Sequence, residues 1–149
     1  MPKLSIGLKG RVHITVRSAE SGELLEERTV NNLVVNAGRH QICDLMIGAS
    51  TSSFNFCGVG SSNQTPSPSD TDLIQPIAPR KQVTDRFRTS NVATFSTFFS
   101  SSENNGTWSE CGLFTAQTGG AMLCRAVFNP PITKDQSKTV TIDWDIEVS

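Results

Sequence analysis

Charged residues are scarce in this sequence, and neither sign dominates. Asp, Glu, Lys and Arg make up 18% of the 149 residues, and 13 basic against 14 acidic side chains leave a net charge of −1. The basic residues are scattered among acidic ones, whereas a nucleic-acid-binding surface normally needs a concentrated basic stripe. We therefore expect no nucleic-acid partner.

Long apolar runs are missing as well. No stretch approaches the roughly 20 residues that a membrane-spanning helix needs. The opening segment, residues 1–12, lacks the apolar centre of a secretory signal. We therefore expect no membrane partner, and synthesis without export through the secretory pathway.

The four cysteines show no metal-binding spacing. Cys43, Cys57, Cys111 and Cys124 form no CxxC pair and have no histidine at ligand spacing, which argues against a zinc site. We expect four small buried side chains that stay reduced in a cytoplasm. A disulfide between Cys111 and Cys124 stays open as an alternative, because a hairpin described below would make them diagonal neighbours.

Signatures of the common enzyme classes are also absent: there is no GxSxG elbow, Walker loop, HExxH motif or dinucleotide fingerprint. Residues 54–59 are expected to form a buried strand that ends at Gly60, but no helix follows the glycine pair Gly58 and Gly60 to bind phosphate. His13 and His40 are expected on the surface. The sequence therefore predicts no catalytic, cofactor-binding or metal-binding residue.

The composition favours short strands joined by many turns. Apolar content is 36%, which is low for a globular protein, and Ser, Thr and Asn are frequent instead. The sequence also holds eleven Gly, seven Pro and eight Phe. The length suits a single domain spanning residues 1–149, with one core.

The stretch 106–128 predicts a central β-hairpin. Two apolar runs, residues 108–116 and 121–128, flank a glycine-containing turn. Both runs carry apolar residues on both faces, as in a strand pair buried inside a domain. The predicted partners are Ala116 with Ala121, Phe114 with Leu123, and Leu113 with Cys124.

Period-two alternation predicts the other strands. Residues 11–17 and 24–30 form one expected hairpin, and residues 82–90 and 91–101 form another. The last strand has the cleanest pattern. Its expected inward residues are Val140, Ile142, Trp144, Ile146 and Val148, and its expected outward residues are Thr139, Thr141, Asp143, Asp145 and Glu147.

One short amphipathic helix is expected between the first hairpin and residue 48. Asn36 suits its N-cap and Gly48 its exit. Ile42, Leu45 and Met46 fall on one side and should face the sheet.

Two segments are expected to be extended. Residues 61–79 are rich in Ser and hold four of the seven prolines, which remove backbone donors and stiffen the chain. Residues 1–10 precede the first patterned strand. The sequence predicts a long Pro/Ser-rich loop at 61–79 and an N-terminal arm at 1–10, each available to contact a partner.

Acidic residues at two places carry alternative interpretations. Asp143, Asp145 and Glu147 lie about 7 Å apart along one strand face. That spacing allows a glycosidase pair or a calcium site, although a solvated charged face is the ordinary interpretation. Glu110 stands among apolar residues, either as a buried acid with a raised pKa or paired with Arg125 on the neighbouring strand.

Four motifs in order resemble those of a known group of proteins. They are NNLVVNAGRHQICDLMIG (residues 31–48), FCGVGSSNQTPSPSDTDL (56–73), NGTWSECGLF (105–114) and GGAMLCRAVFNPPITKDQSKTVTIDWDIEV (119–148). Their order and spacing resemble small structural proteins of tailed bacteriophages. Members of that group are capsid decoration (cement) proteins and tail-associated or fibre-associated proteins. The four cysteines depart from the pattern, since apolar or small residues are ordinary there. This departure leaves open an oxidised, cross-linked role outside the cell.

The resemblance and the residue patterns together predict a mainly β protein. The expected fold is an antiparallel β-sandwich or barrel-like (β-tulip-like) single domain with one short α-helix and extended arms. The implied function is that of a non-enzymatic capsid decoration protein. Such a protein would be made in the host cytoplasm, bind the outer capsid surface and stabilise the head. The expected partners are the major capsid protein and further copies of the chain in a homotrimer.

A tail, baseplate or fibre module that adheres to a host glycan or docks a fibre is the alternative. Exposed aromatic side chains in a groove would favour it, because sugar rings stack on them. Trp108 and Trp144 are expected to face inward, which favours decoration. A glycosidase that uses Glu110 with an acid of the last strand is the least favoured hypothesis.

Overall fold

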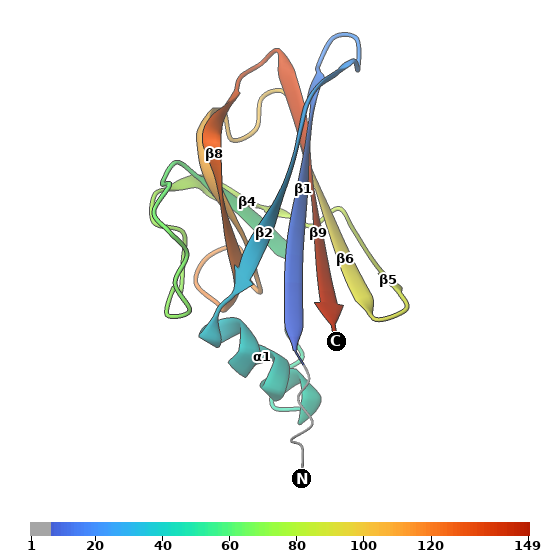
Figure 1. The fold of residues 1–149 in the computed structure, drawn as a ribbon, viewed down its shortest axis with the longest axis vertical. Helices are drawn as coiled ribbons and strands as arrows, with labels where there is room; N and C mark the ends of the chain where they lie inside the picture. The colour runs from blue at the N-terminus through green and yellow to red at the C-terminus, as the bar shows by residue number, and fades with distance from the viewer. Residues whose placement is uncertain (1–6) are drawn as a thin grey trace.

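A computed structural model describes residues 7–149, which form one antiparallel sheet and one helix (Figure 1). The strand order is β4-β3-β7-β8-β2-β1-β9-β6-β5, and the sheet curls into a half-barrel. The expected mainly β, barrel-like domain with one short helix is thereby confirmed. The elements are β1 (Leu8–Ser18), β2 (Leu24–Val34), α1 (Asn36–Met46), β3 (Phe56–Gly60), β4 (Pro76–Gln82), β5 (Asp85–Thr89), β6 (Val92–Phe99), β7 (Gly106–Phe114), β8 (Met122–Lys134) and β9 (Lys138–Val148).

The curled sheet consists of two halves that enclose the core between them. Strands β2, β1, β9, β6 and β5 form the β1 half-sheet, and strands β4, β3, β7 and β8 form the β7 half-sheet. Within residues 7–149, the strand pairing that joins them is that of β2 with β8, at Leu33 with Arg125 and Val34 with Cys124. Apolar side chains from both halves share one buried cluster. For example, Phe99 of β6 meets Trp108 of β7 edge to face, with ring centroids 5.0 Å apart.

The β1 half-sheet follows the predicted alternation closely. The two predicted hairpins form as β1–β2 and β5–β6, and β9 pairs with β1 along its whole length. Trp144 is fully buried, whereas Val148 is 48% exposed. The inward assignment of Val148 was therefore wrong, because this residue lies beyond Ile146, the last residue of β9 in the core.

The central hairpin forms as β7 and β8, and nearly all of β7 is buried on both faces. Leu113 pairs with Cys124 as predicted. A register shift then pairs Phe114 with Met122 instead of Leu123. β7 ends and β8 begins at this pair, so Ala116 and Ala121 lie outside both strands. The predicted register was wrong at this point because a β-bulge adds an unpaired residue that alternation alone does not reveal.

The helix α1 lies across the end of the half-barrel and packs directly on β8 (Figure 1). A Cβ at Gly38 would come within 2.5 Å of the carbonyl oxygen of Leu123, so only glycine permits this approach. The N-cap is Val35 rather than Asn36, because the Val35 carbonyl accepts the first helical hydrogen bond, from the Arg39 amide at 3.1 Å. Gly48 follows the helix with a φ of +76°, as its predicted exit role requires. Met46 was expected to face the sheet but is 80% exposed, in the last turn of the helix.

The long loop folds back on its own domain. Residues 61–75 cover the outer face of the β7 half-sheet, where Leu73 joins a second buried cluster with Phe114 and Met122. The predicted loop 61–79 therefore ends earlier, because β4 begins at Pro76. Of the predicted arm 1–10, residues 1–6 lie outside the described residues, and Leu8 to Gly10 belong to β1.

The first prediction concerns the core of the β1 half-sheet. Trp144→Ala should lower the free energy of unfolding by about 3–5 kcal/mol, because it empties a large, fully buried site. Val148→Ala on the same strand should cost less than about 0.5 kcal/mol. Urea unfolding followed by circular dichroism measures both. A loss below about 1 kcal/mol for Trp144→Ala would contradict its placement in the core.

Candidate functional site

The outer face of the β1 half-sheet carries two parallel columns of opposite charge. Lys9, Arg11 and His13 point outward from β1, and Glu147, Asp145 and Asp143 stand directly opposite them on β9. This face is solvated, in contrast to the outer face of the β7 half-sheet, which residues 61–75 cover. The predicted outward face of β9 is thus confirmed, and it is now seen to adjoin a basic strand.

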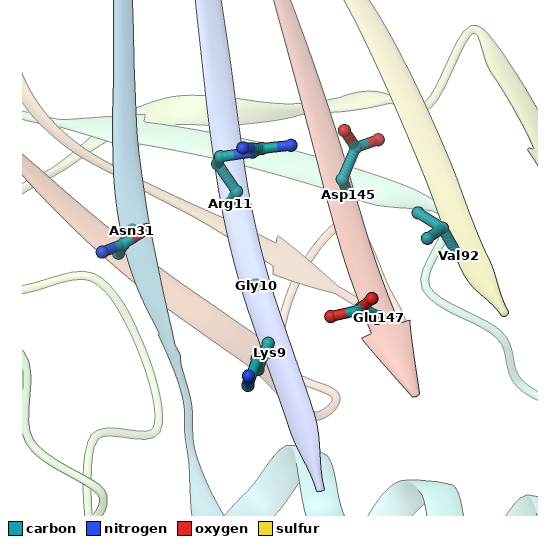
Figure 2. A pocket seen from close by; sticks show the side chains of 7 residues that line it. All are labelled: Lys9, Gly10, Arg11, Asn31, Val92, Asp145 and Glu147. Atoms are coloured by element: carbon teal, nitrogen blue, oxygen red, sulfur yellow. The ribbon is translucent and has the colours of Figure 1, made fainter. Parts of the chain in front are cut away.

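A groove of about 290 Å³ runs across these columns (Figure 2). Figure 2 shows Arg11 extending from β1 toward Asp145 on the neighbouring strand. Among the salt bridges within residues 7–149, there is none between Arg11 and Asp145 and none between Lys9 and Glu147. The lining residues are Lys9, Gly10, Arg11, Asn31, Val92, Asp145 and Glu147.

Neighbouring side chains hold the carboxylates of this face in place. The Thr94 hydroxyl of β6 donates to Asp145 Oδ1 at 2.7 Å, and the Ser96 hydroxyl donates to Asp143. In the same row as Asp143, His13 Nδ1 lies 2.7 Å from the Thr29 hydroxyl oxygen. The groove therefore presents charged groups with set positions on a rigid sheet. Among residues 7–149, no group of three His, Cys, Asp or Glu side chains is placed to hold a metal ion.

The other candidate acid, Glu110, is fully buried and paired with Arg125, as one of the two predicted alternatives stated. Arg125 Nε donates to Glu110 Oε1 at 3.0 Å, and neither side chain is exposed. Burying a charged pair costs several kcal/mol per ion unless further hydrogen bonds satisfy it. Here three backbone amides donate hydrogen bonds to the carboxylate. Ile74 donates to Oε1 at 2.9 Å, and Ser62 and Gln75 donate to Oε2 at 3.0 Å and 2.8 Å.

The loop residues also provide acceptors for the arginine Nη1, whereas its Nη2 is buried without a hydrogen-bond partner among residues 7–149. Arg125 Nη1 donates to the Gln64 carbonyl at 2.8 Å and lies 3.4 Å from Asp70 Oδ2. Nearby, Arg80 stacks 3.5 Å above the Phe114 ring and donates to Asp72 Oδ1 at 3.2 Å. These polar residues therefore hold the loop 61–75 against the sheet.

The two sets of acids lie on opposite sides of the core. Glu110 faces the loop outside the β7 half-sheet, whereas Asp143, Asp145 and Glu147 lie on the outer face of the β1 half-sheet. The structure therefore does not bring together the residues that the glycosidase hypothesis needs.

Lys134 is a buried cation that the strand patterns did not single out. Its Nζ donates to the carbonyls of Ser100 at 2.8 Å and Glu103 at 3.0 Å and to the Asn105 side chain at 2.6 Å. Burial lowers the pKa of Lys134. The only sequence signal was its place in the last of the four motifs, because its partners come from a turn thirty residues away.

A second, mostly apolar hollow of about 470 Å³ lies beside the loop on the β7 half-sheet. Leu73, Ile77 and Pro79 line it together with the turn at residues 117–119. Arg80 closes one wall by donating to the carbonyls of Ala116 at 2.8 Å and Gly119 at 2.7 Å. The charged side chain of this wall is thus already engaged in internal contacts.

Three of the four cysteines are buried as expected, and all four are free thiols. Cys43 is exposed on α1, so its expected burial was wrong: the helix covers the sheet with its other side, around Gly38. Burial raises the pKa of Cys57 to about 12, and the facing side chains of Trp144 and Thr97 offset part of that rise. Burial also raises the pKa of the Cys111 and Cys124 thiols.

Within residues 7–149, no helix has the length and apolar character to cross a membrane. A scan against protein-family models and a search of the curated proteins each found no match for this chain.

The second prediction tests the buried ion pair. Glu110→Gln keeps the size of the side chain but leaves the Arg125 charge buried beside a neutral group. It should cost about 3–5 kcal/mol in the free energy of unfolding. Glu147→Gln, on the open face, is the matched control and should cost less than about 0.5 kcal/mol. Equal losses for the two variants in urea titrations would contradict the role assigned to Glu110.

The third prediction concerns thiol reactivity, which requires an accessible thiolate. A maleimide at pH 8 should label the folded protein once, at Cys43, and the urea-unfolded protein four times. Cys43→Ser should abolish labelling of the folded form while three sites remain in the unfolded form. Mass spectrometry counts the additions, and rapid labelling of any second site in the folded protein would contradict the packing described above.

Proposed function

We propose that this chain is a non-enzymatic structural protein of a tailed-bacteriophage virion, and that it is a capsid decoration protein. One observation carries the proposal: the distinctive polar and aromatic residues of the four motifs make internal contacts that stabilise the fold. Glu110, Arg125 and Lys134 are buried in hydrogen-bond networks, Asp70 faces Arg125, and Trp144 fills the core. Motif residues that hold a fold together support a structural role.

The exposed apolar residues support binding to other proteins. Met46 and Ile47 are 80% and 78% exposed at the end of α1, and Leu24 and Leu25 are exposed at the β1–β2 turn. Adjacent exposed apolar side chains commonly mark contact sites for proteins. Figure 1 shows the β1–β2 turn and α1 at opposite ends of the long axis of the molecule. Two contact points at opposite ends suit a clamp across neighbouring capsid subunits.

A clamp of this kind stabilises a capsid by mass action. A protein that binds only the closed lattice contributes roughly 2.7 kcal/mol per site at a hundredfold excess over its dissociation constant. With a net charge of −1, long-range attraction contributes little, and the apolar contacts supply the binding energy. The proposed partners are the major capsid protein and further copies of the chain in a homotrimer on the capsid surface.

The tail, baseplate or fibre module is the second candidate, and one observation favours it. Both tryptophans are buried as expected, but Phe87 and Phe98 are exposed on the outer face of the β1 half-sheet. Exposed aromatic side chains on a polar face are typical of surfaces that bind sugars or partner proteins.

The fourth prediction separates the two candidates. Particles that lack this protein should assemble normally but release DNA at a lower temperature than complete particles. The purified protein should restore the release temperature, with little dependence on salt. A Met46→Asp/Ile47→Asp variant should fail to restore it, whereas Phe98→Asp, at an exposed apolar residue on the outer face of the β1 half-sheet, should succeed. If depleted particles release DNA normally but cannot adsorb to cells, the tail module replaces the decoration protein.

A further inference from the structure

We propose that the groove of Figure 2 binds a neutral saccharide, with the ring hydroxyls held between β1 and β9. The proposal does not depend on the location of the protein in a virion. It follows from the arrangement of donors, acceptors and an aromatic side chain on the open face of the β1 half-sheet.

The groove offers donors and acceptors side by side. Arg11 and Lys9 supply N–H donors on one strand, and Asp145 and Glu147 supply carboxylate acceptors on the next. A sugar hydroxyl both donates and accepts, so it can bridge a cation and a carboxylate that stand close without forming a salt bridge. Asn31, on the far side of β1, adds a group that does both.

The charge balance selects a neutral ligand. Two cations and two anions line the groove, so neither a phosphate nor a metal ion meets a surplus of opposite charge. The hydroxyl of Thr94 fixes Asp145 at 2.7 Å, which reduces the entropy that the carboxylate would lose on binding. A polyol gains hydrogen bonds to both charge types, and such charge-assisted hydrogen bonds are the stronger kind.

Phe87 supplies an apolar platform at a suitable distance. It pairs with Thr94 on β6, and Thr94 pairs with Asp145 on β9, so the three side chains form one row across the outer face. Two strand spacings place Phe87 about 10 Å from Asp145. Phe87 is 52% exposed, and Val92 lies in the neighbouring row. The first ring of a disaccharide would occupy the groove, and the second would stack on Phe87.

The test is a titration of the full chain, followed by nuclear magnetic resonance, with glucose and maltose, galactose and lactose, and N-acetylglucosamine and chitobiose. At least one disaccharide should bind with saturable shifts at residues of β1, β9 and β6. Arg11→Ala and Asp145→Asn should each weaken binding by roughly tenfold or more, as expected for hydrogen bonds to charged groups. Arg17→Ala and Glu27→Gln, on the same face but outside the groove, should bind like the unaltered protein.

Phe87→Ala separates the two parts of the site. It should weaken binding of the disaccharide several-fold while leaving the matching monosaccharide unchanged. Thermal melting checks that each variant folds, and Phe87→Leu provides a second, milder variant at that exposed position. The proposal is overturned if no sugar of the panel gives saturable shifts. It is also overturned if Arg11→Ala and Asp145→Asn leave binding unchanged, or if inorganic phosphate alone occupies the groove. Binding to capsids is measured separately, so failure here leaves the decoration proposal standing.

Discussion

The buried contact between Glu110 and Arg125 is the constraint on which the outer layer of this protein depends. A carboxylate in the interior must be fully hydrogen-bonded, and Glu110 meets this need with Arg125 and three backbone amides. Those amides belong to the two ends of the loop, at Ser62 and at Ile74 and Gln75. One side chain therefore fixes where the loop leaves the sheet and where it returns. Because its ends are fixed, the loop can place Leu73 against Phe114 and bury the outer face of the β7 half-sheet.

Arg125 extends this constraint to the rest of the sheet. It pairs with Leu33 at the short junction between the two half-sheets, next to the pairing of Val34 with Cys124. The same residue thus contacts the loop, β7 and the junction. This position explains how a sheet that is continuous through only two residue pairs keeps its curl: the loop and the ion pair brace the β7 half-sheet beside the junction.

Local patterns in the sequence predicted most of the strands, but not β4, which begins inside the expected loop 61–79, and they did not predict the non-local geometry. Alternation identified β9 and the hairpins, and the hairpin register placed Glu110 within reach of Arg125. The bulge that pairs Phe114 with Met122 cannot be predicted from the alternation of apolar and polar residues in the sequence. The groove escaped prediction because it arises from pairing between β1 and β9, the two ends of the chain. Cys43 and Met46 were misplaced because α1 faces the sheet with the side that carries Gly38, Ile42 and Leu45, which only the packing reveals.

The two half-sheets differ in what lies on their outer faces. Each has an inner face in the core and an outer face with polar groups, but residues 7–149 cover only the outer face of the β7 half-sheet. The outer face of the β1 half-sheet keeps its charged columns and Phe87 in solvent. The apolar residues of the two proposed contact points, Leu24 and Leu25 at the β1–β2 turn and Met46 and Ile47 at α1, lie elsewhere, at the two ends of the long axis (Figure 1). Contacts with capsid neighbours through these ends would leave the charged face free between them. A clamp and a saccharide site are therefore compatible on one small domain, because they use different surfaces.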